Sequence, residues 1–238
     1  MAKKTAILSI ALVCMFIVYV IIPKREFIIP IFPLQPDETL LAYDDQADGG
    51  SSVSQMNRSD SALDFRCTLG KEMSQGAWCG LIWDLAGKKT GPRYENWSLV
   101  DSILIEVFSE KDAEIIAKVW TFDPDVTNRD SLRTFRQLLK EIPLKKGSNK
   151  VSIAFDEFYV PDFWFRENGA DKDLVQRHKE HVARFEITPG WKTKSGVQEH
   201  FRFTRIEAKG IGSFELAIFL GCCVVILIVA LGFIKKKT

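Results

Sequence analysis

The chain has 238 residues, of which 46% are hydrophobic and 26% are charged, and its 32 Lys and Arg nearly balance its 31 Asp and Glu. Averages of this kind are typical of one soluble domain. The apolar residues, however, are concentrated in two runs without a charged residue, 5–22 and 216–234. As a helix, each run is long enough to cross about 30 Å of hydrocarbon. The sequence therefore predicts two transmembrane helices, which argues against a cytosolic enzyme and against a polytopic transporter or channel.

Lysines beside the two runs predict the orientation in the membrane. Lys3 and Lys4 precede the first run, and the lysines at 235–237 follow the second. Because Lys and Arg near the end of a span are retained on the cytoplasmic side, we expect both termini in the cytoplasm. The cations at 24–25 flank the other end of the first run, so the second run decides, since only Glu215 flanks its other end. The predicted location is the inner (cell) membrane, with a periplasmic central domain.

Two alternatives to this topology stay open. The first run could be a cleaved signal peptide, but it is long and no small-x-small cleavage site follows it, so we favour an uncleaved anchor. The sequons at 57–59 and 96–98, with the lysine-rich tail, would fit an endoplasmic reticulum membrane protein with a lumenal domain. Chance sequons are common and lysine after a span is an ordinary anchor, so we favour the bacterial location.

The segment between the runs is mildly acidic. Residues 27–213 contain 25 Lys and Arg against 29 Asp and Glu. Proteins that bind nucleic acid normally carry a basic excess, so no nucleic acid partner is expected.

The five cysteines divide by location. Cys14, Cys222 and Cys223 fall within the apolar runs, whereas Cys67 and Cys79 form the one pair in the central segment. An oxidising compartment favours a disulfide between them, which would stabilise the fold by roughly 3 kcal/mol in the chain-entropy model. Two free buried thiols are the alternative. A metal site is disfavoured because the pair has no CxxC spacing and no nearby His.

The central segment predicts an all-β domain. Residues 23–38 contain Pro30 and Pro33 and indicate a stiff linker rather than a helix. Beyond it, stretches such as 102–107 alternate apolar and polar residues with a period of two, which is the pattern of a sheet with one buried face. Eight short strands of this kind favour a two-sheet β-sandwich or jelly roll. The expected strands are 40–43, 63–69, 78–85, 102–108, 115–122, 150–155, 182–187 and 200–208.

Two short polar stretches, 131–140 and 170–179, are expected to form helical insertions in loops. The chain then divides into six segments. In order, these are a cytoplasmic N-terminus (1–4), a transmembrane helix (5–22), a linker (23–38), an extracytoplasmic β-sandwich domain (39–212), a transmembrane helix (214–234) and a cytoplasmic tail (235–238).

Several stretches of the central segment resemble galactose-binding-like jelly rolls. The stretch 43–52, from Tyr43-Asp44-Asp45 to Ser51-Ser52, is similar to the opening strand and turn of that group, which includes carbohydrate-binding modules and the complex I intermediate-associated protein 30 type. The order of 151–165, 184–187 and 203–210 is similar to carbohydrate-binding-module-like periplasmic sensor domains. Those domains precede the second span of bacterial diguanylate cyclases and sensor kinases. The similarity covers roughly 37–211, and we expect no catalytic output domain because the sequence stops at Thr238.

Aromatic and acidic residues are the candidates for a ligand site. Sugar-binding sandwiches stack aromatic faces on the C–H surfaces of the sugar and grip hydroxyls with carboxylates and amides. The residues of these types that we select are Trp120, Asp123, Asp125, Phe163 and Trp164. Trp191, in the turn-like context after Pro189-Gly190, is a further candidate. The alternative for the tryptophans is the core of the sandwich, where large aromatic side chains usually lie.

The resemblance also implies a structural Ca²⁺ at the sheet edge, with Asp44, Asp45 and Glu207 as its oxygen ligands. Solvated Asp-rich turns are the alternative, and no other cofactor is expected. No nucleophile elbow, zinc-protease helix or phosphate-binding glycine loop is present in the sequence. We therefore expect that the protein is not an enzyme.

The sequence thus predicts a membrane-anchored extracytoplasmic binding or sensory accessory protein. Its expected partners are the lipid bilayer, a separate membrane protein or a second copy of the chain, and a glycan. One alternative is a structural or assembly subunit of a membrane complex, whose sandwich binds protein. A membrane-tethered glycan-active enzyme is the third hypothesis.

Overall fold

The structure of the protein is a computed structural model that describes residues 2–21, 26–34, 39–71, 76–86, 94–173, 176–211 and 213–235. The predicted tail beyond residue 235, the last residue of the first predicted transmembrane helix (22) and parts of the predicted linker (23–25 and 35–38) lie outside the described residues. The chain divides into two compact units, one formed by 1–27 with 210–238 and the other by 28–209.

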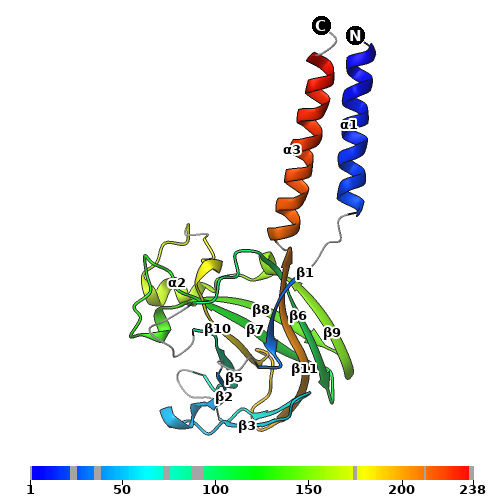
Figure 1. The fold of residues 1–238 in the computed structure, drawn as a ribbon. Helices are drawn as coiled ribbons and strands as arrows, with labels where there is room; N and C mark the ends of the chain where they lie inside the picture. Colours follow the sequence, from blue (N-terminus) through cyan, green and yellow to red (C-terminus); the bar gives the residue numbers. More distant parts are fainter. Residues whose placement is uncertain are drawn as a thin grey trace. The chain divides into compact units, whose positions relative to one another are not determined.

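The first unit contains helices α1 (Ala2–Ile21) and α3 (Ser213–Lys235), which cover both charge-free runs. They contact each other side by side and run antiparallel, so the beginning of α1 and the end of α3 lie at the same end of the pair (Figure 1). Ala11 and Ala230 are their buried side chains among those described. Among the described residues, no helix combines the length and the apolar character that a membrane span requires.

The second unit is a sandwich of two antiparallel sheets (Figure 1). Sheet A has the strand order β3-β4-β11-β6-β9, with β1 pairing to β11, and sheet B has the order β2-β5-β10-β7-β8. The strands of sheet A are β1 (Glu26–Phe32), β3 (Val53–Arg58), β4 (Leu63–Thr68), β6 (Val100–Ser109), β9 (Gly147–Ala154) and β11 (Gln198–Ile211). Those of sheet B are β2 (Thr39–Asp44), β5 (Cys79–Asp84), β7 (Ala113–Thr121), β8 (Arg136–Leu144) and β10 (Val182–Pro189).

The hydrophobic core lies between the two sheets and is built by alternating residues of most strands; β3 contributes no buried side chain. In β5, for example, Leu81 and Trp83 are fully buried, and β10 contributes Phe185 and Ile187 opposite them. Sheet A adds apolar side chains of the same kind from β4, β6 and β11. Full burial of each such side chain contributes about 1.5–3 kcal/mol relative to exposure. The prediction of an all-β sandwich is confirmed.

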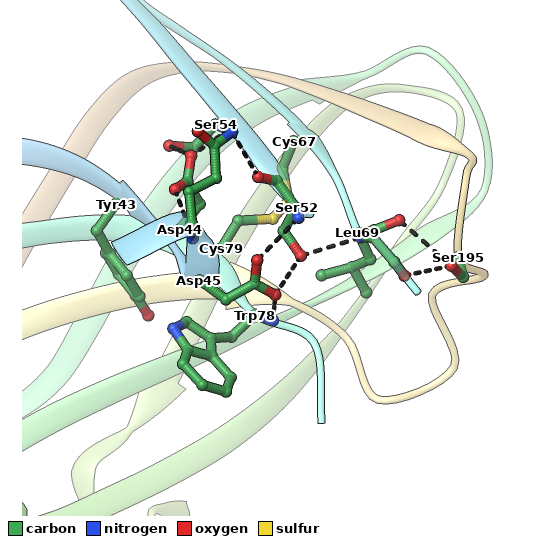
Figure 2. The surroundings of a disulfide bond; sticks show 12 residues. Tyr43, Asp44, Asp45, Ser52, Ser54, Cys67, Leu69, Trp78, Cys79 and Ser195 are labelled. Carbon is green, nitrogen blue, oxygen red and sulfur yellow. Dashed lines mark hydrogen bonds between the residues drawn. A yellow bond between two sulfur atoms is a disulfide. The ribbon is translucent and has the colours of Figure 1, made fainter. Parts of the chain in front are cut away.

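A disulfide joins the two sheets at one end of the sandwich (Figure 2). Cys67 lies on β4 in sheet A and Cys79 begins β5 in sheet B. Their Cα atoms are 6.3 Å apart, a normal separation for a disulfide. The predicted pairing of these two cysteines is confirmed.

All eight predicted strands are present, and three strands of the described chain were not predicted. Strand β1 lies inside the predicted linker and pairs with β11, so 26–32 is part of the sandwich despite Pro30. Strand β3 and strand β8 are the other two.

Both predicted helical insertions are wrong. Within 131–140, only Leu132–Thr134 forms a short 3₁₀ turn, and Arg136 begins strand β8, which pairs with β7 along its whole length. The described part of 170–179 is irregular until a 3₁₀ turn begins at Lys179. A helix of this region, α2 (Asp162–Asn168), occurs earlier and ends where Gly169 adopts a φ of 60°. Glycine reaches this left-handed conformation without the strain of a Cβ.

We expect the double variant Cys67→Ser/Cys79→Ser to lower the free energy of unfolding by about 3 kcal/mol, because the bridge no longer restricts the unfolded chain. Urea denaturation of the full chain, followed by tryptophan fluorescence, measures this change. Cys14→Ser is the matched control and should leave the midpoint unchanged. An unchanged midpoint in the double variant would contradict the expectation.

Candidate functional site

The outer face of sheet B carries polar and aromatic side chains that alternate with the core residues. The strand register places Leu41, Ile82, Glu186 and Lys118 in one row across β2, β5, β10 and β7. Leu41 is exposed, whereas Glu186 in the middle of the row is only 2% exposed. A carboxylate buried to this degree needs hydrogen-bond donors.

Three donors, one from β2 and two from β7, surround Glu186. The indole Nε1 of Trp120 donates to Oε2 at 2.7 Å, and the Lys118 ammonium lies 2.8 Å from Oε1. The Tyr43 hydroxyl donates to the same Oε1. Its ring reaches Glu186 by crossing Gly80, where an added Cβ would lie 2.7 Å from the ring. Burial, assisted by the Glu186 charge, raises the pKa of Tyr43 well above its ordinary value.

A second carboxylate on the same face, Glu141 of β8, holds two more aromatic side chains. The Tyr159 hydroxyl and the Trp191 indole Nε1 both donate to its Oε1, at 2.5 Å and 2.9 Å. Backbone hydrogen bonds between Tyr159 and Leu139 place the Tyr159 segment along β8. Both rings remain open to solvent, with exposed fractions of 44% for Tyr159 and 60% for Trp191.

The charges of this second cluster are set by the same hydrogen bonds. Burial alone would raise the pKa of Glu141, but the hydrogen bonds from Tyr159 and Trp191 lower it overall, so the carboxylate stays ionised. Burial and the Glu141 carboxylate raise the pKa of Tyr159 to about 12. We name the six side chains of the two clusters the aromatic–carboxylate face. They are Tyr43, Trp120, Glu141, Tyr159, Glu186 and Trp191.

Such a face has the chemistry of a sugar site. Hydrogen bonds to the carboxylates orient the indole and phenol rings, whose exposed surface can pack on the C–H groups of a sugar. Lys118 and the amide of Gln137 on the neighbouring strand supply polar groups for hydroxyls. Of the five residues predicted to bind a ligand, Trp120 lies on this face, where it is half-buried.

Two of the other predicted ligand residues belong to a separate buried cluster. Asp123 is fully buried and pairs with the buried Arg136, whose Nε lies 2.9 Å from Oδ2. Trp164 is 1% exposed and donates its Nε1 to the Phe135 carbonyl at 2.7 Å. The Arg136 guanidinium lies over the Trp164 ring, 4.9 Å from its centroid. These contacts place Asp123 and Trp164 in internal packing, which corrects the prediction that they face a ligand.

The remaining two predicted residues are not brought into one site. Asp125 is exposed, and its backbone N–H donates to Asp123 Oδ1 at 3.0 Å. Phe163 is half-buried in the first turn of α2. Neither residue lies on a strand of sheet B.

The predicted calcium ligands are also separated. Asp45 is buried, and its oxygens accept hydrogen bonds from Ser52 N, Ser52 Oγ and Trp78 N, which together lower its pKa although burial alone would raise it (Figure 2). Asp44 accepts from Ser54 N at 3.0 Å and caps the following turn.

Glu207 lies far from both aspartates. Asp44 pairs with Cys79, and Cys67 on the other side of the disulfide pairs with Glu199. Glu207 is eight residues farther along β11, about 26 Å of extended strand. Among the described residues, no group of three His, Cys, Asp or Glu side chains could hold a metal ion. The prediction of a calcium site at Asp44, Asp45 and Glu207 is therefore wrong.

Two hollows open on the surface of the β unit. One, of about 470 Å³, lies on the outer face of sheet A and is lined by polar residues of β3, β4 and β11, among them Gln55, Asp64 and Arg202. Arg202 and His200 both bond to Asp64 and hold the pKa of that carboxyl below its usual range. The other hollow, of about 450 Å³, lies near Trp191 and includes Glu114 and Glu199 in its lining.

Comparison with known proteins identifies the fold. No family model and no curated protein matches the chain. Among solved structures, the family 11 carbohydrate-binding module from Clostridium thermocellum, in complex with a β-1,3-1,4-mixed-linked tetrasaccharide, is similar, with a TM-score of 0.51 and 11% identity. The alignment covers 78% of this chain and 96% of that chain. The family 11 module of a cellulosomal cellulase of Clostridium thermocellum has a TM-score of 0.51 and 12% identity, and the coverage is 79% and 96%. The β unit therefore resembles the jelly roll of carbohydrate-binding modules in fold.

Sequence reasoning missed most of the aromatic–carboxylate face. A usable signal was present in β10, where Arg184 and Glu186 alternate with apolar residues and must therefore point away from the core. No comparable signal marks Tyr159, because its place beside β8 depends on a segment outside the regular strands.

We expect tyrosines of the folded chain to ionise at higher pH than those of the unfolded chain. The pKa of Tyr159 is raised to about 12, and those of Tyr43 and Tyr94 are also raised by burial. A raised tyrosine pKa stabilises the fold below the unfolded value of about 10, and this stability is lost as the pH rises through the folded value. Ultraviolet absorbance of tyrosinate, recorded with and without guanidinium, measures the difference. Tyr159→Phe should remove one of the ionisation steps that occur at high pH in the folded chain. If all tyrosines of the folded chain ionise near the unfolded value, the raised pKa values are contradicted.

Proposed function

We propose that the β unit is a glycan-binding domain and that the aromatic–carboxylate face of sheet B is its ligand surface. The observation that carries this proposal is the pair of carboxylates, Glu186 and Glu141, that orient four aromatic side chains on one face. The likeness of the fold to carbohydrate-binding modules supports it.

The electrostatics of the face support binding of a glycan by contact rather than by reaction. Hydrolysis of a glycosidic bond needs one carboxyl that donates a proton and a second that faces it across the bond. Glu141 stays ionised because its pKa is lowered, and Glu186 already accepts three hydrogen bonds. The strand spacing separates their Cα atoms by about 12 Å. We therefore propose a binding protein and not an enzyme.

We further propose that the protein is held at the inner (cell) membrane by residues 5–22 and 214–234, with the β unit in the periplasm. The proposal rests on the two charge-free runs and on the lysines outside them. The antiparallel contact of α1 with α3 agrees with two termini on one side of a membrane (Figure 1). In this arrangement, glycan occupancy would pass through the two helices to a separate membrane protein, as in sensory accessory subunits.

We expect Trp120→Ala and Trp191→Ala each to lower the affinity for a bound oligosaccharide by about tenfold, since each removes an oriented aromatic contact worth on the order of 1.4 kcal/mol. A glycan array identifies ligands, with the β-1,3-1,4-mixed-linked tetrasaccharide as the first probe, and calorimetry measures the affinities.

Phe108→Ala is the matched control, because Phe108 is an exposed aromatic residue on sheet A. Its affinity should equal that of the unchanged chain. If no glycan binds, or if Phe108→Ala weakens binding as much as the tryptophan variants do, the proposed ligand surface is incorrect. Co-purification of a fixed protein assembly without glycan binding would favour the assembly-subunit alternative.

We expect a phosphatase reporter fused after Thr238 to be inactive and a fluorescent reporter at the same place to be active in bacterial cells. The reason is that lysines 235–237 would retain this end in the cytoplasm. An active exported phosphatase at Thr238 would overturn the proposed topology. The control is a fusion after Lys146, in the turn between β8 and β9, which should give the opposite pair of activities.

A further inference from the structure

The hollow near Trp191 lies at the end of the aromatic–carboxylate face. Its lining comes from the turn between β6 and β7 with the start of β7, from the end of β8 and the turn that follows it, and from the segment before β11 with the start of β11. The volume of about 450 Å³ is within the size range of small-molecule sites. Pro143 and Val197 contribute apolar surface to it.

Two of the lysines that line the hollow are available to an anion. Lys111 pairs with Glu199 at 3.0 Å, and Lys145 pairs with Asp112 at 3.0 Å. Lys192 and Lys194 are exposed, and the ammonium group of neither makes a hydrogen bond or ion pair with another described residue. Two unpaired ammonium groups two residues apart favour a negatively charged group between them.

A buried acceptor lines the same hollow. Glu199 is 7% exposed, and while its Oε1 pairs with Lys111, its Oε2 is buried without a hydrogen-bond partner in the described part of the chain. An unpaired buried carboxylate oxygen carries an uncompensated desolvation penalty. A hydroxyl group of a ligand is a donor that can satisfy such an oxygen.

Backbone contacts connect the hollow to the aromatic–carboxylate face. Glu114 lines the hollow. It lies two residues before Ile116, so both point to the outer side of β7, and Ile116 lies opposite Glu141. The Gly190 N–H donates to the Glu114 carbonyl at 2.7 Å, and Trp191 follows directly and bonds Glu141. The exposed Trp191 ring is therefore the part of the face next to the hollow, and one extended ligand can reach both.

We propose that this hollow is a subsite for an acidic sugar, a uronate, so that the protein prefers glycans that contain uronic acid. The uronate carboxylate pairs with Lys192 and Lys194, and its hydroxyls donate to Glu199. A neutral sugar would leave the two ammonium groups without a counter-charge, and a simple inorganic anion would leave the Glu199 oxygen without a donor. This inference rests on the glycan-binding function proposed above and names its ligand class.

The full chain in detergent is titrated by calorimetry with tetragalacturonate and with the neutral mixed-linked tetrasaccharide. We expect Lys192→Gln/Lys194→Gln to lower the affinity for tetragalacturonate by about tenfold, because two charge-assisted contacts are lost. The affinity of this variant for the neutral tetrasaccharide should stay within about twofold of that of the unchanged chain, because no charge-assisted contact is lost. The acidic affinity should also fall as salt is added, because the lysines are exposed.

The matched control is Lys150→Gln/Lys172→Gln, which removes the same charge from exposed lysines on β9 and after α2. An equal loss of tetragalacturonate affinity in this control would overturn the subsite, since the attraction would be a property of the net charge. Failure of tetragalacturonate to bind would also overturn it. If tetraglutamate binds as tightly as tetragalacturonate, the hollow is an anion site without selectivity for sugars, and the proposal is overturned.

These outcomes separate this inference from the proposed function. Neutral glycans that bind in a Trp120-dependent manner, with no preference for tetragalacturonate, overturn the uronate subsite and leave glycan binding in place. A glycan array without any ligand overturns both.

Discussion

A carboxylate that is buried on the outer side of a sheet needs hydrogen-bond donors from the surrounding strands. Glu186 is such a carboxylate, and the outer side of sheet B is arranged around it. An unpaired charge at 2% exposure would destabilise the fold by several kcal/mol. Its partners come from both sides of β10, with Tyr43 from β2 and both Lys118 and Trp120 from β7. One side chain thus sets the orientation of polar groups on two other strands. Gly80 is part of the same arrangement, because any larger residue would block the path of the Tyr43 ring.

The second carboxylate, Glu141, accepts hydrogen bonds from aromatic side chains in the same way at the edge of sheet B. It holds Tyr159 and Trp191, two rings from irregular segments that would otherwise be free to reorient. Rings held in place before a ligand arrives lose little conformational entropy when they bind it. This property connects the hydrogen bonds of the face with its proposed role, since the cost of ordering the binding groups is met during folding.

The two faces of the sandwich differ in kind. The outer side of sheet A has charged networks, such as Glu106 with Arg205 and Lys150, and these hydrogen bonds lower the pKa of Glu106. Exposed surface pairs of this type contribute little stability, about 0–1 kcal/mol each. The outer side of sheet B instead uses its carboxylates to position aromatic rings. The difference explains why we assign the glycan surface to sheet B although a hollow of similar size lies on sheet A.

Much of the fold could be predicted because strand alternation is a local property. The stretch 102–107 and β10 show the period of two directly, and the disulfide followed from there being two cysteines in the central segment. Strand β8 could not be predicted in the same way. Its polar residues, among them Arg136, suggested a surface helix, whereas Arg136 is buried because Asp123, thirteen residues away, pairs with it. Pairing at that distance is invisible to a local pattern.

The candidate site shows the same division. Trp120 was selected by residue type, and the structure places it on the aromatic–carboxylate face; Trp164 was selected by the same criterion and is buried against Arg136. The sequence by itself determined the β class, the cysteine pair and the two charge-free runs, because composition and a period of two depend on neighbouring residues alone. Only the tertiary structure decided which aromatic residues reach the surface together. That outcome depends on strand order and register, which bring Tyr43, Trp120 and Glu186 together across more than a hundred residues of chain.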